Sequence, residues 1–404
     1  MAEALFTLAS TGTPGLRFDG DDPRLAAAAW SRIAEPGDPV AGALVGHLGV
    51  VEALAWLVDA ARDPSQVPVA DLAGVRPASA ERLAQAVARW APRLGSLDPR
   101  RELRVLERCE GTLLVPGDER WPDGLAGLGA AAPFALWVRG NADLSTWARR
   151  SVALVGARAS TAYGERVAAN LACGLVDRGF AVVSGGAYGI DAAAHSGALA
   201  AEGVTCAVMA GGVDRFYPQG NDDLLRQVLA TGTVLSEVPP GSAPFRQRFL
   251  ARNRLIAALT GATVVVEAAH RSGALSTARH AVQLHRPVGA VPGPVTSMAS
   301  AGCHALLRDG AAVCVTGAED VAELAGAMGD DAAAAERSAP VGPRDGLDPD
   351  ERMLWDALPV RSGATTDSVA ASAGLAPRRV MTLLGSFERR GLARRDGARW
   401  VRGS

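Results

Sequence analysis

The stretches that decide the fold are VALVGARASTAYG, residues 152–164, and VVSGGAYGIDAAAH, residues 182–195. Each starts with a continuous apolar run, turns at glycine and continues as an alanine-rich segment, which is typical of a buried parallel strand followed by a helix. This alternation continues to residue 327 and predicts an α/β fold around a parallel sheet. Strands are predicted at 152–155, 181–184, 205–209, 233–235, 263–266, 288–291 and 312–315, and helices at about 163–178, 189–202, 220–230, 251–260, 274–285, 300–309 and 318–327.

The sequence on either side of this region predicts further domains. Residues 1–110 are rich in alanine and leucine at helical spacing, which indicates a helical domain before the sheet domain at 111–328. Residues 329–346 mix small residues, charge and proline without periodicity and are predicted to form a linker. Residues 347–404 show three short helical patterns and a hairpin pattern with Asp396-Gly397 at its turn, so a winged-helix domain is predicted.

Composition narrows the class of protein. The chain has 404 residues, 48% hydrophobic and 21% charged, which fits a folded soluble protein. It shows no apolar run of eighteen residues and no basic segment at its start, so we expect no membrane contact and a cytoplasmic location. The five cysteines form no CxxC pair, which argues against disulfides and a cysteine zinc site. We predict neither a metal nor a cofactor.

Three glycine turns are expected at one edge of the sheet, where open α/β sheets bind ligands. The first contains Gly156, Arg158 and Ser160, the second Ser184, Gly185, Gly186 and Tyr188, and the third Gly211 and Gly212. The topology is Rossmann-like, but Arg158 occupies the position of a glycine in the dinucleotide motif, and without any lysine there is no P-loop. Ordinary strand-to-helix turns are the alternative. Asp191 and His195, four residues apart, are expected to have a structural role.

An arginine cluster is expected near the same edge. The segment FRQRFLARNR, residues 245–254, interleaves arginine with phenylalanine and contains no acid. Guanidinium groups can bind phosphates while aromatic rings stack on bases, although a solvated charged loop would show the same pattern. The candidate binding residues are Arg246, Arg248, Phe249, Arg252, Asn253 and Arg254, joined by Ser272 and Gly273 in a fourth turn.

The motifs from residue 152 onward, above all YPQGN, RNRLI and SGALSTA, resemble the DNA-processing protein A family, DprA or Smf. The resemblance implies an extended Rossmann-like core, a SAM-like helical start and, in many members, a winged-helix end. It implies a homodimer that binds and protects single-stranded DNA and loads the recombinase RecA during natural transformation or related DNA processing. Such a protein is a mediator and not an enzyme. Tyr188 departs from the family, where a basic residue is frequent.

Two other functions are alternatives. One is a nucleotide-binding or nucleotide phosphoribohydrolase-type enzyme on the same fold, but a phosphoribohydrolase would need a catalytic acid and SGALSTARHA offers none at the corresponding turn. A regulator of duplex DNA would act through the last domain, where residues 371–404 hold eight arginines against Glu388 and Asp396, a local charge of +6. Arg378 and Arg379, at the start of its candidate recognition helix, are the predicted accessory DNA contacts.

Overall fold

The computed structural model describes residues 16–62, 80–326, 331, 344 and 346–403. The chain divides into two compact units, residues 1–333 and 334–404, which we describe separately. The predicted linker at 329–346 lies mostly outside the described residues. Among the described residues, no single helix is long and apolar enough to span a membrane; one bent pair, Pro39–Leu48 with Val50–Arg62, passes that test when its two helices are taken together.

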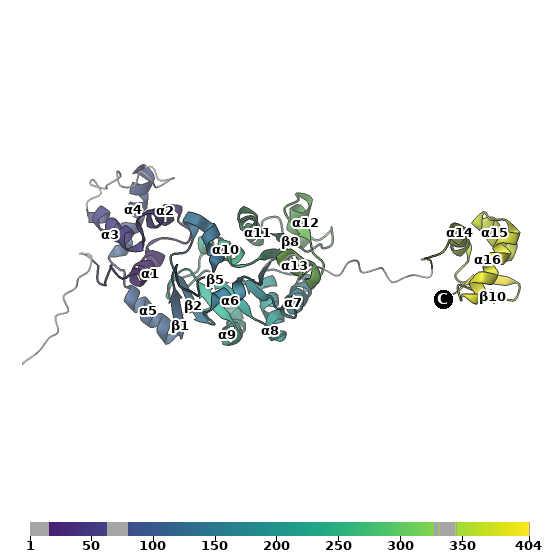
Figure 1. The fold of residues 1–404 in the computed structure, drawn as a ribbon, viewed down its shortest axis with the longest axis horizontal. Coiled ribbons are helices and arrows are strands. Elements are labelled where there is room, and N and C mark those ends of the chain that lie inside the picture. Colours follow the sequence, from purple (N-terminus) through teal and green to yellow (C-terminus); the bar gives the residue numbers. More distant parts are fainter. Residues whose placement is uncertain (1–15, 63–79, 327–330, 332–343, 345, 404) are drawn as a thin grey trace, which may run out of the picture. The chain divides into compact units, whose positions relative to one another are not determined.

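A nine-stranded sheet forms the centre of the first unit, in the order β1-β2-β6-β5-β4-β3-β7-β8-β9 (Figure 1). In this order, the seven strands that begin with β6 and end with β9 run parallel to one another, which confirms the predicted parallel sheet. Strands β1 and β2 form an antiparallel pair beside them, and the sequence did not predict this pair. The strands are β1 (Gly111–Leu114), β2 (Leu136–Gly140), β3 (Ser151–Val155), β4 (Ala181–Ser184), β5 (Thr205–Met209), β6 (Thr233–Ser236), β7 (Ala262–Val265), β8 (Val288–Ala290) and β9 (Val313–Cys314).

Helices cover both faces of the sheet. Val152 and Leu154 of β3 pack against α7, α8 and α13, whereas Ala153 and Val155 pack against α10 and α11 on the other face. Burial on both faces explains why these strands are continuously apolar. The helices are α6 (Leu144–Ala148), α7 (Ala162–Val176), α8 (Ile190–Ala200), α9 (Asp222–Thr231), α10 (Arg246–Leu259), α11 (Ala274–Gln283), α12 (Ala301–Arg308) and α13 (Ala318–Ala325).

Among the described residues 16–62 and 80–110, five helices precede the sheet within the same compact unit. They have a core of their own, in which the rings of Trp30 and Trp90 meet edge to face at 5.6 Å. Ala27 and Leu106 pack against Trp137 of β2, so the helical region also shares a core with the sheet. The helices are α1 (Pro23–Ile33), α2 (Pro39–Leu48), α3 (Val50–Arg62), α4 (Ala80–Leu94) and α5 (Pro99–Arg108).

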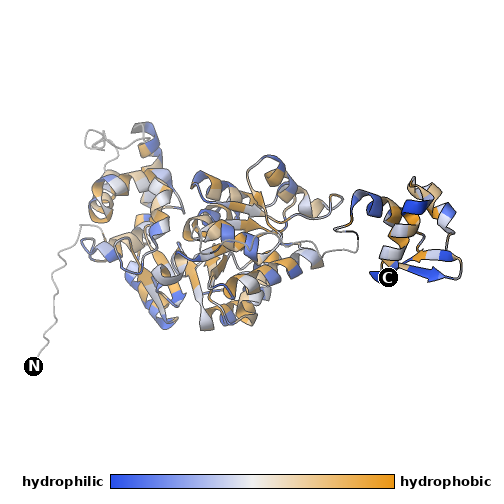
Figure 2. Ribbon diagram, turned by 45° about the vertical axis from the view of Figure 1, so that its right-hand side comes forward, coloured by the Kyte–Doolittle hydropathy of each residue, from blue (hydrophilic) through white to orange (hydrophobic). Residues whose placement is uncertain are grey.

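The described part of the second unit, residues 344 and 346–403, contains three helices and a two-stranded hairpin. These are α14 (Pro349–Ala357), α15 (Thr366–Ala373), α16 (Pro377–Arg389), β10 (Ala393–Asp396) and β11 (Arg399–Arg402). The ring centres of Trp355 and Phe387 lie 6.2 Å apart in a separate small core. Colouring by hydropathy shows hydrophilic residues on the hairpin, while the helices carry both hydrophobic and hydrophilic residues (Figure 2).

Candidate nucleic-acid interface

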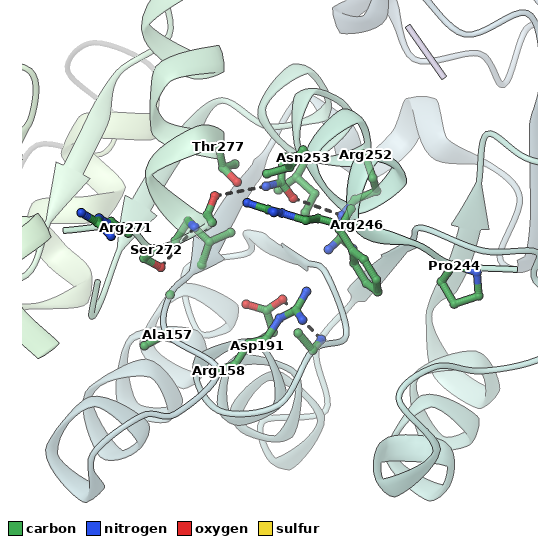
Figure 3. A pocket seen from close by; sticks show the side chains of 18 of the residues that line it. Ala157, Arg158, Asp191, Pro244, Arg246, Arg252, Asn253, Arg271, Ser272 and Thr277 are labelled. Carbon is green, nitrogen blue, oxygen red and sulfur yellow. Dashed lines mark hydrogen bonds between the residues drawn. The ribbon is translucent and has the colours of Figure 1, made fainter. Parts of the chain in front are cut away.

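A pocket of about 730 Å³ opens at the carboxyl ends of β3 and β7 (Figure 3). These strands are neighbours although they are far apart in sequence, and the chain order reverses between them, since β4 and β5 lie on one side and β8 on the other. Open α/β sheets bind ligands in the crevice at such a switch point. The turns after β3 and β7 and the helix α10 form its walls.

The turn after β3 is held tightly by its neighbours. A Cβ atom at Gly156 would lie 2.5 Å from Ile190 Cγ1, so glycine is required for α8 to pack here. The buried carboxylate of Glu267 accepts hydrogen bonds from Thr161 N at 2.9 Å and Thr161 Oγ1 at 2.6 Å, at the start of α7. The turn is therefore fixed from both sides, and Arg158 at its tip is exposed and lines the pocket.

The turn after β4 is fixed by Asp191 of α8. Its Oδ2 atom accepts the N–H groups of Gly185 at 3.1 Å and Ala187 at 3.4 Å. Burial raises the pKa of Asp191, and the charge of Arg252 partly offsets the rise. Ser184 is fully buried and its hydroxyl donates to Leu154 O at 2.6 Å, so it does not face the pocket.

Arg252 connects α10 to the turn after β4, and Asn253 connects it to the turn after β7. Arg252 Nη1 donates to Gly185 O at 2.8 Å and to Val208 O, and burial lowers its pKa to about 10. A Cβ at Gly185 would lie 2.5 Å from this guanidinium, which explains the glycine there. Asn253 Nδ2 donates to Gly273 O at 3.2 Å, just before α11. Both residues line the pocket, but Arg252 Nη1 and Asn253 Nδ2 already donate to backbone carbonyls.

The groups available to a ligand are guanidinium groups and aromatic rings. The Arg158 guanidinium lies 4.7 Å from the ring centre of Phe249. The ring centres of Tyr217 and Phe249 are 5.7 Å apart. Tyr217 is 47% exposed. Arg246 and Arg271 also line the pocket and are exposed. This combination of cations and open ring faces suits phosphates and unpaired bases.

Two predicted contacts lie elsewhere. Arg254 is buried and makes a two-pronged ion pair with Glu237, at 2.7 and 2.6 Å. Arg248 pairs with Glu35, in the loop between α1 and α2, at 2.9 Å. Burial of Glu35 would raise its pKa, but the hydrogen bonds from Arg248 and Arg93 outweigh this and lower it. Both arginines are engaged within the protein, and neither is among the pocket's lining residues.

The remaining predicted residues divide between pocket and surroundings. Ser272 and Gly273 line the pocket at the start of α11. Ser160 donates to Glu165 Oε1 at 2.7 Å, and the Tyr188 hydroxyl accepts from Gly220 N at 3.2 Å, both outside the lining. Gly186 is buried with a φ of +66°, which only glycine adopts easily. Arg378 and Arg379 belong to the second unit.

The prediction missed four lining residues that matter to the site: Asp191 as a lining group, Tyr217, Phe245 and Arg271. Tyr217 stands in the third glycine turn, and Arg271 directly precedes Ser272, so the sequence contained a signal for both. Among the described residues, no three histidine, cysteine or acidic side chains group as metal ligands would.

Comparison with known proteins identifies the family. The family model described as DNA recombination-mediator protein A matches residues 112–326. The chain belongs to this family. A putative DNA processing protein DprA from Mycobacterium tuberculosis is 49% identical over 309 residues, covering 74% of this chain and 79% of the relative.

Two solved structures are also similar. The X-ray structure of DprA from Streptococcus pneumoniae matches with a TM-score of 0.55 and 32% identity, over 66% of this chain and 90% of that one. The DprA of Helicobacter pylori, solved for its single-stranded DNA binding mode, matches with a TM-score of 0.48 and 29% identity, over 52% and 94%. The resemblance inferred from the motifs is therefore confirmed, and the chain is a member of a family of DNA recombination mediators.

Proposed function

We propose that this chain binds single-stranded DNA in the pocket at the ends of β3 and β7, protects the strand and loads RecA onto it. The observation that carries the proposal is the placement of Arg158 over Phe249, beside the exposed ring of Tyr217. A cation and open ring faces together bind phosphates and stack on bases. The process served is natural transformation or related DNA processing, in the cytoplasm.

The pocket favours a single strand over a duplex. Stacking on Tyr217 and Phe249 requires a base that has left its neighbours, which a single strand provides without the cost of unpairing. The exposed guanidinium groups of Arg158, Arg246 and Arg271 supply the charge for the adjoining phosphates. Arg252 and Asn253 contribute indirectly, because they hold the walls in place.

Arg158→Gln and Arg271→Gln should each weaken single-strand binding by about 1–3 kcal/mol, because each removes a charge-assisted phosphate contact. Fluorescence titration with a short labelled strand measures the loss, and a RecA filament assembly assay measures loading. The wild-type log affinity should fall with log salt by about 0.7 per phosphate neutralised. The matched control is Arg149→Gln, an 84% exposed arginine outside this pocket. Equal losses in Arg149→Gln, or equal affinity for duplex and single strand, would contradict the proposal.

The enzymatic alternative depends on Asp191, the one acidic side chain among the described residues that line the pocket. Its two backbone hydrogen bonds give it a structural role, and we expect no catalysis. Incubation with nucleoside monophosphates tests this expectation. Release of free base that is lost in Asp191→Asn would favour the phosphoribohydrolase function.

We further propose that the five N-terminal helices form a SAM-like domain, that the last unit is a winged helix and that the protein is a homodimer. Apolar side chains around β8 and the edge strand β9 support the dimer. Val295 is 89% exposed, Met298 71% and Val313 57%. Exposed apolar groups on neighbouring elements are typical of a subunit contact.

The double variant Val295→Arg/Met298→Arg should convert the dimer to a monomer at tens of micromolar protein, because it places two charges in an apolar contact. Sedimentation velocity of the full chain measures the change. Met381→Arg is the matched control, since Met381 is 66% exposed on the second unit. A wild-type protein that sediments as a monomer at this concentration would disprove the homodimer.

A further inference from the structure

The arginines of the second unit differ in whether an acidic side chain offsets their charge. On α16, Arg379 Nε lies 2.8 Å from Asp350 Oδ2. Arg390, which follows the helix, places Nη1 2.6 Å from Glu351 Oε1. Both acids lie in the first turn of α14. The predicted recognition helix therefore faces acids that neutralise part of its charge.

The hairpin arginines have no such neutralisation. Arg394, Arg395 and Arg399 are exposed, and none of them takes part in an ion pair with a described residue. Arg395 Nε donates to Gly397 O at 3.0 Å, and Arg399 Nη1 donates to Gly363 O at 3.0 Å. A carbonyl oxygen orients a guanidinium group but leaves its charge uncompensated.

The contact between Arg399 and Gly363 places the loop of residues 360–363 beside the hairpin. Arg361 in that loop is also exposed. We call Arg361, Arg394, Arg395 and Arg399 the hairpin surface. Strongly hydrophilic residues lie on the hairpin in Figure 2. Asp396 is the one acidic residue of the hairpin itself, residues 393–402.

We propose that the hairpin surface binds the phosphate backbone of duplex DNA. A two-stranded ribbon is narrow enough to enter a groove of the duplex. Guanidinium groups suit phosphate oxygens, and these four can bind without first losing an acidic partner. This site is separate from the pocket and does not depend on the proposed single-strand function.

The lack of an open ring face favours the duplex over a single strand. Single-strand sites combine charge with exposed aromatic rings, as the pocket does. Trp400 on the hairpin is only partly exposed, whereas the ring of Tyr217 in the pocket is 47% exposed. Among the described residues of this unit, the exposed large apolar side chains are Met353, Val360 and Met381, none of them aromatic. The hairpin surface can therefore bind phosphates but offers little for an unpaired base.

The test uses the full chain with a labelled 20-base-pair duplex and a single strand of the same length. Arg394→Gln/Arg395→Gln/Arg399→Gln should weaken duplex binding and make the slope of log affinity against log salt shallower by about 3, roughly one per arginine. The corresponding triple lysine variant keeps the charge and should keep the slope. Single-strand affinity should change much less, because it reports the pocket.

Two further variants keep the test decisive. Arg344→Gln/Arg352→Gln/Arg389→Gln, the helix triple, removes the same charge from α14, α16 and the residue that pairs with Asp356 of α14, and should leave the duplex slope unchanged. Arg394→Gln alone changes a side chain with no described hydrogen bond, so the fold is preserved and the slope should fall by about 1. A larger loss in the helix triple than in the hairpin triple would overturn the proposal. So would an unchanged duplex slope in the hairpin triple.

Discussion

Replacing Arg254 with methionine should lower the free energy of unfolding by about 3–5 kcal/mol, because it leaves Glu237 as an uncompensated buried charge. The two side chains are 5% and 7% exposed and are joined by hydrogen bonds of 2.7 and 2.6 Å. Arg254 Nε also donates to Ala131 O at 2.9 Å, so the loss includes a further buried hydrogen bond. Urea unfolding followed by circular dichroism measures the difference.

The double variant Arg254→Met/Glu237→Leu is the control for this prediction. It removes both charges and should recover most of the stability, since replacing a whole buried ion pair with apolar groups is often neutral. The opposite outcome for Arg254→Met would instead identify Arg254 as a DNA contact. In that case Arg254→Met would unfold like the wild type and lose single-strand affinity to the same extent as Arg158→Gln.

The sheet could be predicted from the sequence because its parallel strands are buried on both faces. Val152 and Leu154 face one helical layer while Ala153 and Val155 face the other, so every position had to be apolar. The pair β1 and β2 was missed because it lies at one side of the sheet and runs antiparallel. The start of α10 was missed by five residues, since its first turns carry arginine instead of an apolar pattern.

The sheet edge at which the pocket lies was also predictable, but the contacts of each arginine were not. Glycine turns at strand ends indicate an edge, and the pocket does lie at that edge. Arg158 and Arg254 look equivalent in sequence, yet one is exposed and the other is paired with Glu237, 17 residues away, beyond the end of β6. Tertiary contacts choose such partners, and no local pattern records them.

Acidification should destabilise this protein through His195. The ring is fully buried and its Nδ1 lies 2.7 Å from Thr205 Oγ1. Burial, with a smaller contribution from the charge of Arg252, lowers its pKa to about 3. In the unfolded chain the pKa is about 6.5, so between these values the unfolded state binds a proton that the folded state does not. The free energy of unfolding should then fall by about 1.4 kcal/mol per pH unit below 6.5.

Urea unfolding of the wild type and His195→Gln at pH 7, 6 and 5 isolates this contribution. Asp191, one turn earlier on α8, has a raised pKa and acts in the opposite sense, because its protonated form is favoured in the folded state as pH falls. Both proteins contain Asp191, so its effect cancels in the difference. The free energy of unfolding of the wild type should fall relative to that of His195→Gln from pH 7 to 5, most steeply between pH 6 and 5, whereas His270→Gln, which alters an exposed histidine, should follow the wild type. Parallel curves for the wild type and His195→Gln would mean that His195 takes up a proton within the folded protein.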